Sequence, residues 1–257
     1  MKKTVICLMA LLLTLCCLTA YADASDIAAI QGKGKIVVGI TDYAPMDYLD
    51  DNGEWTGFDA EFARLFAAEL GVDVEFFVLP DWGMKIFELD SKNIDAVWNG
   101  MTITDEIKLN ASVGDAYVVN AQVVVMKADK VAAYADAESL KKLNFAVESG
   151  SAGEDALKDI GIDNYIALQD QTSALMEVAA GTADACVIDI TMANAMTGEG
   201  TSYDNLAAGI ALTSEEYGVA FRKGSDLTEK FNEFMDKLIA DGTLQALAAK
   251  YELTLAK

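Results

Sequence analysis

The fold is decided by a stretch in the first half of the chain that reads Ile94-Asp95-Ala96-Val97-Trp98-Asn99-Gly100-Met101-Thr102-Ile103-Thr104-Asp105-Glu106. Its first five residues are mostly apolar and predict a short buried strand, and the residues after them predict a polar loop. Thr104 is a typical helix N-cap, and the two acids that follow it are favourable in the first turn of a helix. A strand that passes through a short loop into a capped helix is the repeating unit of an α/β fold.

The same alternation of strands and helices recurs on both sides of this stretch. Further strands are predicted at 36–40, 72–79, 118–126, 143–147, 185–190 and 217–221, and helices at 57–70, 82–92, 172–180, 226–240 and 243–251. The helix at 57–70 would bury one apolar face made of Phe58, Phe62, Leu65, Phe66 and Leu70. This order predicts parallel or mixed sheets with helices on both faces, in which ligands bind beyond the carboxyl ends of the strands.

The first 22 residues are predicted to be a secretory signal. Met1-Lys2-Lys3 is basic, residues 5–18 are apolar except for one threonine, and Ala20-Tyr21-Ala22 has the small-x-small pattern of a cleavage site. Only Cys186 then remains in the mature chain, so no internal disulfide is expected. We expect an exported protein, periplasmic or extracellular. A lipid anchor at Cys16 or Cys17 is a weaker alternative, because the residue before each cysteine is not small.

Composition excludes several classes of function. The 257 residues are enough for one large domain or two modest ones, and the net charge of −22 argues against nucleic-acid binding. The chain has no histidine, which removes Ser-His-Asp and Cys-His nucleophiles and every histidine-based metal site. We therefore predict no metal and no cofactor.

Candidate binding residues follow the predicted strands at their carboxyl ends. They are Asp42, Tyr43, Trp82, Asn99, Gly100, Thr102, Thr104, Glu148, Ser151, Ala152 and Asp189. Amides at helix starts and hydroxyls can hold an anionic group, an acid can pair with an ammonium, and an aromatic ring can stack on a side chain or cation. The set predicts a site for a small zwitterion or cation, although Trp82 could also be a core residue and Asp189 a helix cap.

Short motifs in a fixed order resemble one known family. They are Gly57-Phe58-Asp59, Asn93-Ile94-Asp95-Ala96, residues 100–106, residues 184–189, Tyr217-Gly218-Val219-Ala220 and Asp241-Gly242-Thr243-Leu244. Together they resemble the extracellular solute-binding proteins, family 3, of polar amino-acid ABC transporters, over essentially the whole mature chain. The resemblance implies a two-lobed periplasmic-binding-protein type II fold, in which each lobe is a central sheet flanked by helices. Lobe 1 would take residues 27–122 and 217–257, lobe 2 would take 127–212, and hinge strands would lie at 123–126 and 213–216.

The resemblance also implies a function and a role for each candidate residue. The protein would capture a polar amino acid, or a related molecule with an ammonium group, between its lobes and deliver it to a membrane permease. It would act without covalent chemistry, as a monomer, and would meet the membrane only through the permease. Tyr43 and Trp82 would sandwich the ligand side chain, Gly100, Thr102 and Thr104 would receive the α-carboxylate, Ser151 and Ala152 would touch it from the other lobe, and Asp189 would pair with the α-ammonium. Glu148 stands where relatives read the ligand side chain, and Asp42 and Asn99 are neighbours.

One position departs from the family pattern. Relatives carry an arginine three residues after the second threonine, and this chain has Ile107 there. Lys108 is next to it but would point about 100° away around a helix, and both arginines of the chain lie in other segments. Either backbone amides and hydroxyls hold the carboxylate, or the ligand lacks a carboxylate and Glu148 and Asp189 bind a cationic compound. We favour an amino acid or a close derivative.

Two other kinds of protein compete with this interpretation. An exported enzyme similar to cyclohexadienyl dehydratase would use Glu148 or Asp189 as a general acid. Its substrates are anionic, however, and this site has kept its acids while losing the arginine. A sensory ectodomain is the second alternative, and it is disfavoured because no segment after the predicted signal is apolar enough to span a membrane.

Overall fold

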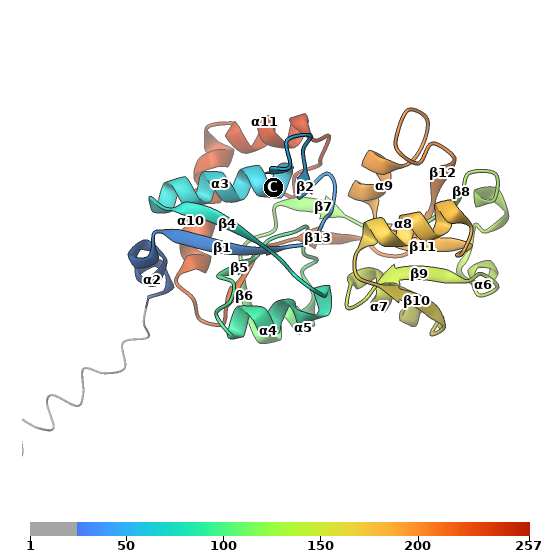
Figure 1. Cartoon of the computed structure of the whole chain (residues 1–257), viewed down its shortest axis with the longest axis horizontal. Coiled ribbons are helices and arrows are strands. Elements are labelled where there is room, and N and C mark those ends of the chain that lie inside the picture. The colour runs from blue at the N-terminus through green and yellow to red at the C-terminus, as the bar shows by residue number, and fades with distance from the viewer. Residues whose placement is uncertain (1–24) are drawn as a thin grey trace, which may run out of the picture.

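The structure is a computed structural model that describes residues 25–257, so the predicted signal lies outside the described residues. Two five-stranded sheets, each flanked by helices, form two lobes that lie side by side (Figure 1). The two-lobed α/β fold expected from the sequence is therefore confirmed. Within residues 25–257, no helix has the length and apolar character needed to cross a membrane.

The first lobe contains both the beginning and the end of the described chain. Its sheet consists of β1 (Lys35–Ile40), β4 (Asp73–Val78), β5 (Ala96–Val97), β6 (Ala111–Val113) and β14 (Ala220–Arg222). Its helices are α2 (Asp26–Lys33), α3 (Phe58–Leu70), the 3-10 turn η1 (Trp82–Met84), α4 (Lys85–Asp90), α5 (Asp105–Asn110), α10 (Leu227–Ala240) and α11 (Thr243–Lys250). The strand order is β4-β1-β5-β14-β6, with β1 parallel to β4 and β5, and β14 antiparallel to β5 and β6. A small hairpin is formed by β2 (Tyr48–Leu49) and β3 (Trp55–Thr56), and its turn contains Asp51-Asn52-Gly53.

Helix α3 fixes the core of this lobe through its apolar face. The buried members of that face are Phe58, Phe62, Phe66 and Leu70. The ring of Phe62 meets that of Trp98 edge to face, with centroids 4.9 Å apart. Leu65 was predicted on the same face and this was wrong, because it lies at the edge of the face and is 37% exposed.

The second lobe is built around another mixed sheet. Its strands are β8 (Gln122–Lys127), β9 (Phe145–Glu148), β10 (Tyr165–Leu168), β11 (Ala185–Asp189) and β12 (Leu206–Ala211). Its helices are the 3-10 turn η2 (Val131–Ala133), α6 (Ala137–Leu140), α7 (Ala152–Asp159), α8 (Gln171–Ala180) and α9 (Ile190–Met196). The order is β10-β9-β11-β8-β12, with β9 parallel to β10 and β11, and β8 antiparallel to β11 and β12. The sequence pattern did not predict β10 and β12.

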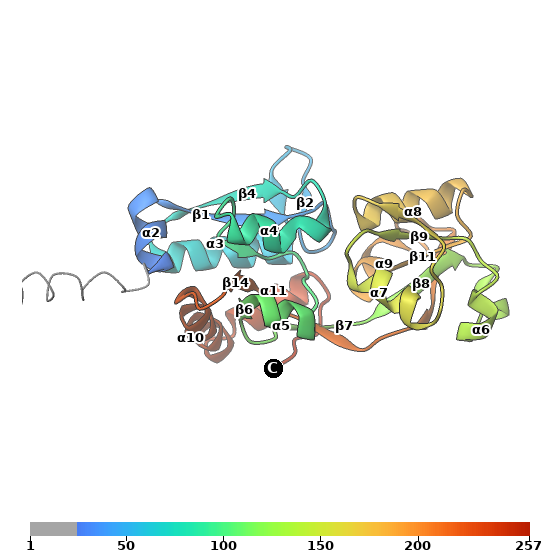
Figure 2. The ribbon, with the colours of Figure 1, turned by 90° about the horizontal axis from the view of Figure 1, so that it is seen from below.

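A two-stranded ribbon joins the lobes. Strand β7 (Val118–Asn120) pairs antiparallel with β13 (Glu215–Tyr217), and Figure 2 shows β7 crossing from one lobe to the other. The single strand predicted at 118–126 is wrong, because the chain changes sheets at Ala121, whose carbonyl accepts a hydrogen bond from the Ile190 amide at 2.8 Å. Residues 123–126, expected as a hinge, lie inside β8 of the second sheet. The strand predicted at 217–221 is likewise divided between β13 and β14.

Candidate functional site

A cavity of about 420 Å³ lies between the lobes, at the carboxyl ends of their parallel strands. Ten of the eleven predicted site residues line it, and they are Tyr43, Trp82, Asn99, Gly100, Thr102, Thr104, Glu148, Ser151, Ala152 and Asp189. Residues that are far apart in the sequence are therefore brought to one space, and both lobes contribute walls.

Asp42 is the predicted residue that does not line the cavity. Its side chain is exposed, and its carbonyl accepts a hydrogen bond from the Thr172 hydroxyl at 3.4 Å. Tyr43, the next residue, turns into the protein instead, because the chain reverses here through hydrogen bonds between Tyr43 and Asp47.

Asp189 ends β11 and is buried at the floor of the cavity, with 3% of its surface exposed. Its carboxylate accepts hydrogen bonds from the amide groups of Asn120, Gln122 and Gln171. Its own N–H donates to the Gln171 side chain at 2.9 Å. Burial, and next the charge of Glu215, raise the pKa of Asp189 to about 7. Although Asp189 precedes α9, its side chain makes no capping hydrogen bond, so the helix-cap interpretation is excluded.

The same amide groups connect Asp189 to the ribbon between the lobes. Glu215 in β13 accepts hydrogen bonds from Asn120 and Gln122, both at 2.7 Å. It also accepts one from the Thr102 hydroxyl of the first lobe at 2.8 Å. A single polar network therefore contacts both lobes and both strands of the ribbon, and it ends in the cavity at Asp189.

Glu148 ends β9 and is the second buried acid of the cavity, with 4% of its surface exposed. Its Oε1 atom has no hydrogen-bond partner among the described residues. Burial, followed by the charge of Asp189, raises the pKa of Glu148 well above its usual range, while Lys85 acts in the opposite direction. A buried carboxylate oxygen without a partner is costly, and a cation in the cavity would satisfy it.

The two predicted aromatic residues have different environments. The hydroxyl of Tyr43 lies 2.5 Å from the hydroxyls of Thr191 and Tyr217, so Tyr43 contacts the second lobe through α9. Trp82 lines the cavity and also packs into the buried apolar cluster that contains Ile107 and Met101. Trp82 therefore fits both alternatives that the sequence left open.

Asn99 and Gly100 are occupied by bonds within the first lobe. The side chain of Asn99 accepts from the amide and hydroxyl of Thr41 and donates to Asp47 at 2.8 Å. The Gly100 amide donates a hydrogen bond to the buried carboxylate of Asp59 at 2.6 Å. This carboxylate also accepts a hydrogen bond from a tyrosine hydroxyl, as a buried carboxylate requires donors. The predicted carboxylate donor at Gly100 thus points away from the cavity and fixes the shape of the loop.

Asp59 itself belongs to a buried pair of acids beneath the loop. Asp59 and Asp47 are both fully buried, and each has one carboxylate oxygen without a hydrogen-bond partner among the described residues. Burial raises the pKa of Asp59 to about 7, despite the opposing hydrogen bonds from Gly100 and Tyr117. Burial and the charge of Asp59 also raise the pKa of Asp47 well above its usual range.

The hydroxyls predicted to receive a carboxylate are mostly engaged. Thr104 is the N-cap of α5, as predicted, and its oxygen accepts from the Ile107 amide at 3.1 Å, which leaves its own proton for another acceptor. Thr102 donates to Glu215. Ser151 caps α7 through a bond from the Glu154 amide at 3.1 Å and donates to a carbonyl at 2.8 Å. The backbone of Ala152 then begins α7 at the cavity wall.

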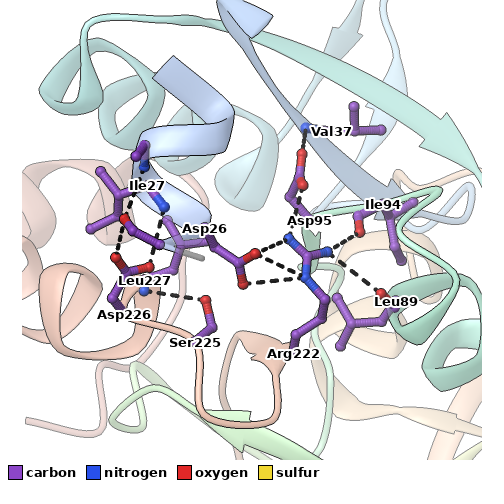
Figure 3. Close-up of polar contacts among 12 residues, drawn as sticks. Asp26, Ile27, Val37, Leu89, Ile94, Asp95, Arg222, Ser225, Asp226 and Leu227 are labelled. Carbon is purple, nitrogen blue, oxygen red and sulfur yellow. Dashed lines mark hydrogen bonds and ion pairs between the residues drawn. The ribbon is translucent and has the colours of Figure 1, made fainter. Parts of the chain in front are cut away.

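No arginine among the described residues lines the cavity. Ile107 lies there and is buried, and Lys108 is exposed on the outside, as predicted. Figure 3 shows the guanidinium of Arg222 held between Asp26 and Asp95, with a further bond to a main-chain carbonyl at 2.7 Å. Arg64 donates to the carbonyl of Trp55 at 2.5 Å.

Lys85 is a cavity residue that the sequence analysis missed. It is the first residue of α4, only 8% exposed, and its ammonium lies 4.7 Å from the centre of the Trp82 ring. It donates to the carbonyl of Trp82 at 3.2 Å and to that of Gly150, in the second lobe, at 3.1 Å. A lysine between Met84 and Ile86, near the start of the helix predicted at 82–92, was the signal that could have identified it.

The lobes touch directly beside this lysine. Gly150 has φ +69°, and a Cβ atom there would lie 2.6 Å from the Cα atom of Gly83. The left-handed backbone disfavours a side chain at this position, and a Cβ atom could not fit the space without separating the lobes. Gln122 and Gln171, the amide partners of Asp189, are further cavity residues that the sequence analysis did not identify.

Comparison with known proteins identifies relatives over most of the chain. Residues 36–254 match the sequence model described as bacterial extracellular solute-binding proteins, family 3. The L-cystine-binding protein TcyJ of Escherichia coli is 30% identical over 239 residues, which cover 90% of this chain and 88% of that protein. The arginine-binding extracellular protein ArtP of Bacillus subtilis is 30% identical over 259 residues, covering 98% of each.

Solved structures agree with these matches. A substrate-binding protein of an amino-acid ABC transporter from Streptococcus pneumoniae, bound to L-arginine, superposes with a TM-score of 0.80 at 28% identity, covering 90% of this chain and 100% of that one. An ancestral amino-acid-binding protein described as a precursor of cyclohexadienyl dehydratase superposes with a TM-score of 0.80 at 32% identity, covering 88% and 99%.

Proposed function

The chain belongs to the bacterial extracellular solute-binding proteins, family 3, and we propose that it binds an amino acid with a positively charged side chain. Proteins of this family bind amino acids and deliver them to ABC permeases, and this transport role is that of the chain described here. The proposal concerns which amino acid is bound and which residues bind it.

The unpartnered Oε1 atom of Glu148 is the observation that carries the proposal. It lines the same cavity as Asp189, and both acids are buried in an environment that raises their pKa values. Two buried carboxylates favour a ligand that supplies two positive groups. The α-ammonium of a basic amino acid would pair with Asp189, and its cationic side chain would pair with Glu148. Trp82 would pack against the aliphatic part of the ligand.

Charge balance supports the same class of ligand. The buried charged residues that line the cavity are Asp189, Glu148 and Lys85, and their net formal charge is negative by one. A basic amino acid carries two positive groups and one negative group. ArtP is named for arginine, and the Streptococcus pneumoniae protein is described as bound to L-arginine, which is consistent with the proposal.

We also propose that the lobes close around the ligand without chemical change to it. The ribbon of β7 and β13 is the connection about which they move, and a bound ligand favours the closed state by its greater affinity for it. An enzyme acting on an anionic cyclic acid is disfavoured, because two buried acids would face that substrate and no arginine would hold it.

Titration calorimetry with a panel of free amino acids tests the proposal. We expect arginine, lysine or ornithine to bind most tightly, with glutamine and glutamate weaker by about 10-fold or more, since one charged hydrogen bond is lost. Glu148→Gln should remove this preference while the far-ultraviolet circular dichroism stays unchanged. Equal or tighter binding of glutamate, or of amines that lack a carboxylate, would contradict it.

A further inference from the structure

The ammonium of Lys85 lies at the seam between the two lobes. It is bonded to a carbonyl of the first lobe in η1 and to the Gly150 carbonyl of the second lobe. Gly150 directly precedes Ser151 and Ala152, whose backbone forms the cavity wall at the start of α7. Lys85 therefore lies beside the part of the second lobe that is proposed to touch the ligand carboxylate.

The first lobe brings its own carboxylate-binding segment to the same place. Lys85 and Thr104 line one cavity with Ile107. Ile107 and Trp82 pack in one buried cluster, and the Trp82 ring lies against the Lys85 ammonium. The lysine thus adjoins the position where relatives carry a guanidinium, and it approaches from α4 instead of α5.

The charge of Lys85 is incompletely paired. An ammonium has three N–H donors, and two of them bind carbonyls. Among the described residues, no carboxylate forms an ion pair with it, and the acids whose charges act on it, chiefly Glu148 and then Glu106, do so without a hydrogen bond. A charge with only 8% of its residue exposed needs an anionic partner.

We propose that Lys85 receives the α-carboxylate of the ligand and so replaces the missing arginine at position 107. This rests on the proposed function, since it assumes an amino-acid ligand. Because the same ammonium is bonded to both lobes, the carboxylate would contact it at the place where the lobes meet. Lys85 is thereby a specificity-determining residue that selects amino acids over the corresponding amines.

Matched pairs of probes that differ only in the carboxylate test the assignment. They are L-arginine with agmatine, L-lysine with cadaverine and L-histidine with histamine, each titrated into the full exported protein by calorimetry. The wild-type protein should bind the amino acid of a pair more tightly than the amine. Lys85→Met should weaken the affinity for the amino acid by about 10-fold to 100-fold and change the affinity for the amine by less than about 3-fold.

Three further variants separate a carboxylate contact from a structural effect. Lys85→Arg should retain the preference for the amino acid, and Lys85→Met combined with Ile107→Arg should recover at least about 10-fold of the lost affinity, because a guanidinium then returns to its usual position. Lys108→Met removes a neighbouring exposed lysine and should leave both affinities within about 3-fold. Circular dichroism checks that each variant is folded.

The outcomes distinguish this inference from the function on which it rests. If Lys85→Met weakens binding of both members of a pair equally, Lys85 acts on Glu148 or on lobe contact, and if it weakens binding of neither, Lys85 does not contribute to ligand binding. In both cases the inference is wrong, while the wild-type data still support an amino-acid-binding protein. If the wild-type protein prefers the amines, the carboxylate has no partner and the inference is wrong as well. If it binds no member of any pair, the proposed ligand class fails and the role of Lys85 with it.

Discussion

Ligand affinity should fall when the pH is lowered below neutrality, because Asp189 must lose a proton to bind an ammonium. Its carboxyl group is 3% exposed, and burial raises its pKa to about 7. In the free protein near pH 5 this group is therefore mostly protonated, and a protonated carboxyl cannot pair with the α-ammonium. Affinity should be constant above about pH 7 and decrease below it, and binding should release a proton in the acidic range.

The size of the effect follows from the shift of the pKa. A rise from 3.8 to about 7 corresponds to on the order of 4 kcal/mol of preference for the protonated form. The ligand ammonium offsets this preference when it binds. Affinity should then fall by about 10-fold for each pH step below 7, so by about 100-fold between pH 7 and pH 5. Burial also raises the pKa of Glu148, so protonation of this acid at lower pH acts in the same direction.

Calorimetry at about pH 8, 7, 6 and 5, in buffers of different ionisation enthalpy, measures both the affinity and the protons released. Asp189→Asn is the matched variant. It should bind more weakly at pH 8, by about 30-fold or more, since the ligand charge loses its buried partner, and its affinity should fall less steeply with acid than that of the wild type. A wild-type affinity that is flat from pH 8 to pH 5, or an Asp189→Asn variant as tight as the wild type at pH 8, would refute the reasoning.

Three other predictions address contacts around the site. Gly150→Ala should weaken ligand binding by about 10-fold or more in calorimetry, because its Cβ atom would lie 2.6 Å from the Cα atom of Gly83. The control Gly161→Ala has a similar positive φ and nothing within 4 Å of its Cβ atom, so it should lower only the unfolding temperature. Equal ligand affinities of the two variants would contradict the proposed closure. Asp59→Asn should raise the unfolding temperature by more than about 4 °C near pH 8 and by little near pH 4. The pKa of Asp59 is about 7 in the folded protein and lower in the unfolded chain, so the stability of the wild type decreases as the pH rises between these two values and stays low above them. A lower unfolding temperature of the variant at pH 8 would contradict this prediction. Arg222→Met should cost about 1.5–3 kcal/mol in urea unfolding, because Asp26 loses the guanidinium while Asp95 keeps its ion pair with Lys33, and should leave ligand affinity unchanged; a loss under about 1 kcal/mol would assign this cluster no structural weight.

The fold could be predicted from the sequence because its motifs report local structure. Thr104 and the acids after it predict the start of α5, and the spacing of the aromatic residues in α3 predicts its buried face. The change of sheets at Ala121 could not be predicted, because residues 118–126 are equally apolar on both sides of it. Which sheet a strand joins depends on its partners, and a single apolar run does not identify them.

The site was predictable where a residue's position at a strand end sets its surroundings. Ten candidates reach one cavity for this reason. The directions of their polar groups were not predictable, since the Gly100 amide turns to Asp59 and the Thr102 hydroxyl to Glu215 through contacts between distant segments. Lys85 was missed for a related reason, because its partner Gly150 belongs to the other lobe.

A crystal structure of the protein with L-arginine tests the central claim most directly. We predict that the ligand occupies the cavity between the lobes, with its α-ammonium on the Asp189 carboxylate, its guanidinium near Glu148 and its carboxylate within hydrogen-bonding distance of the Lys85 ammonium. Arginine bound outside that cavity, or inside it with its ammonium away from Asp189, would contradict the account.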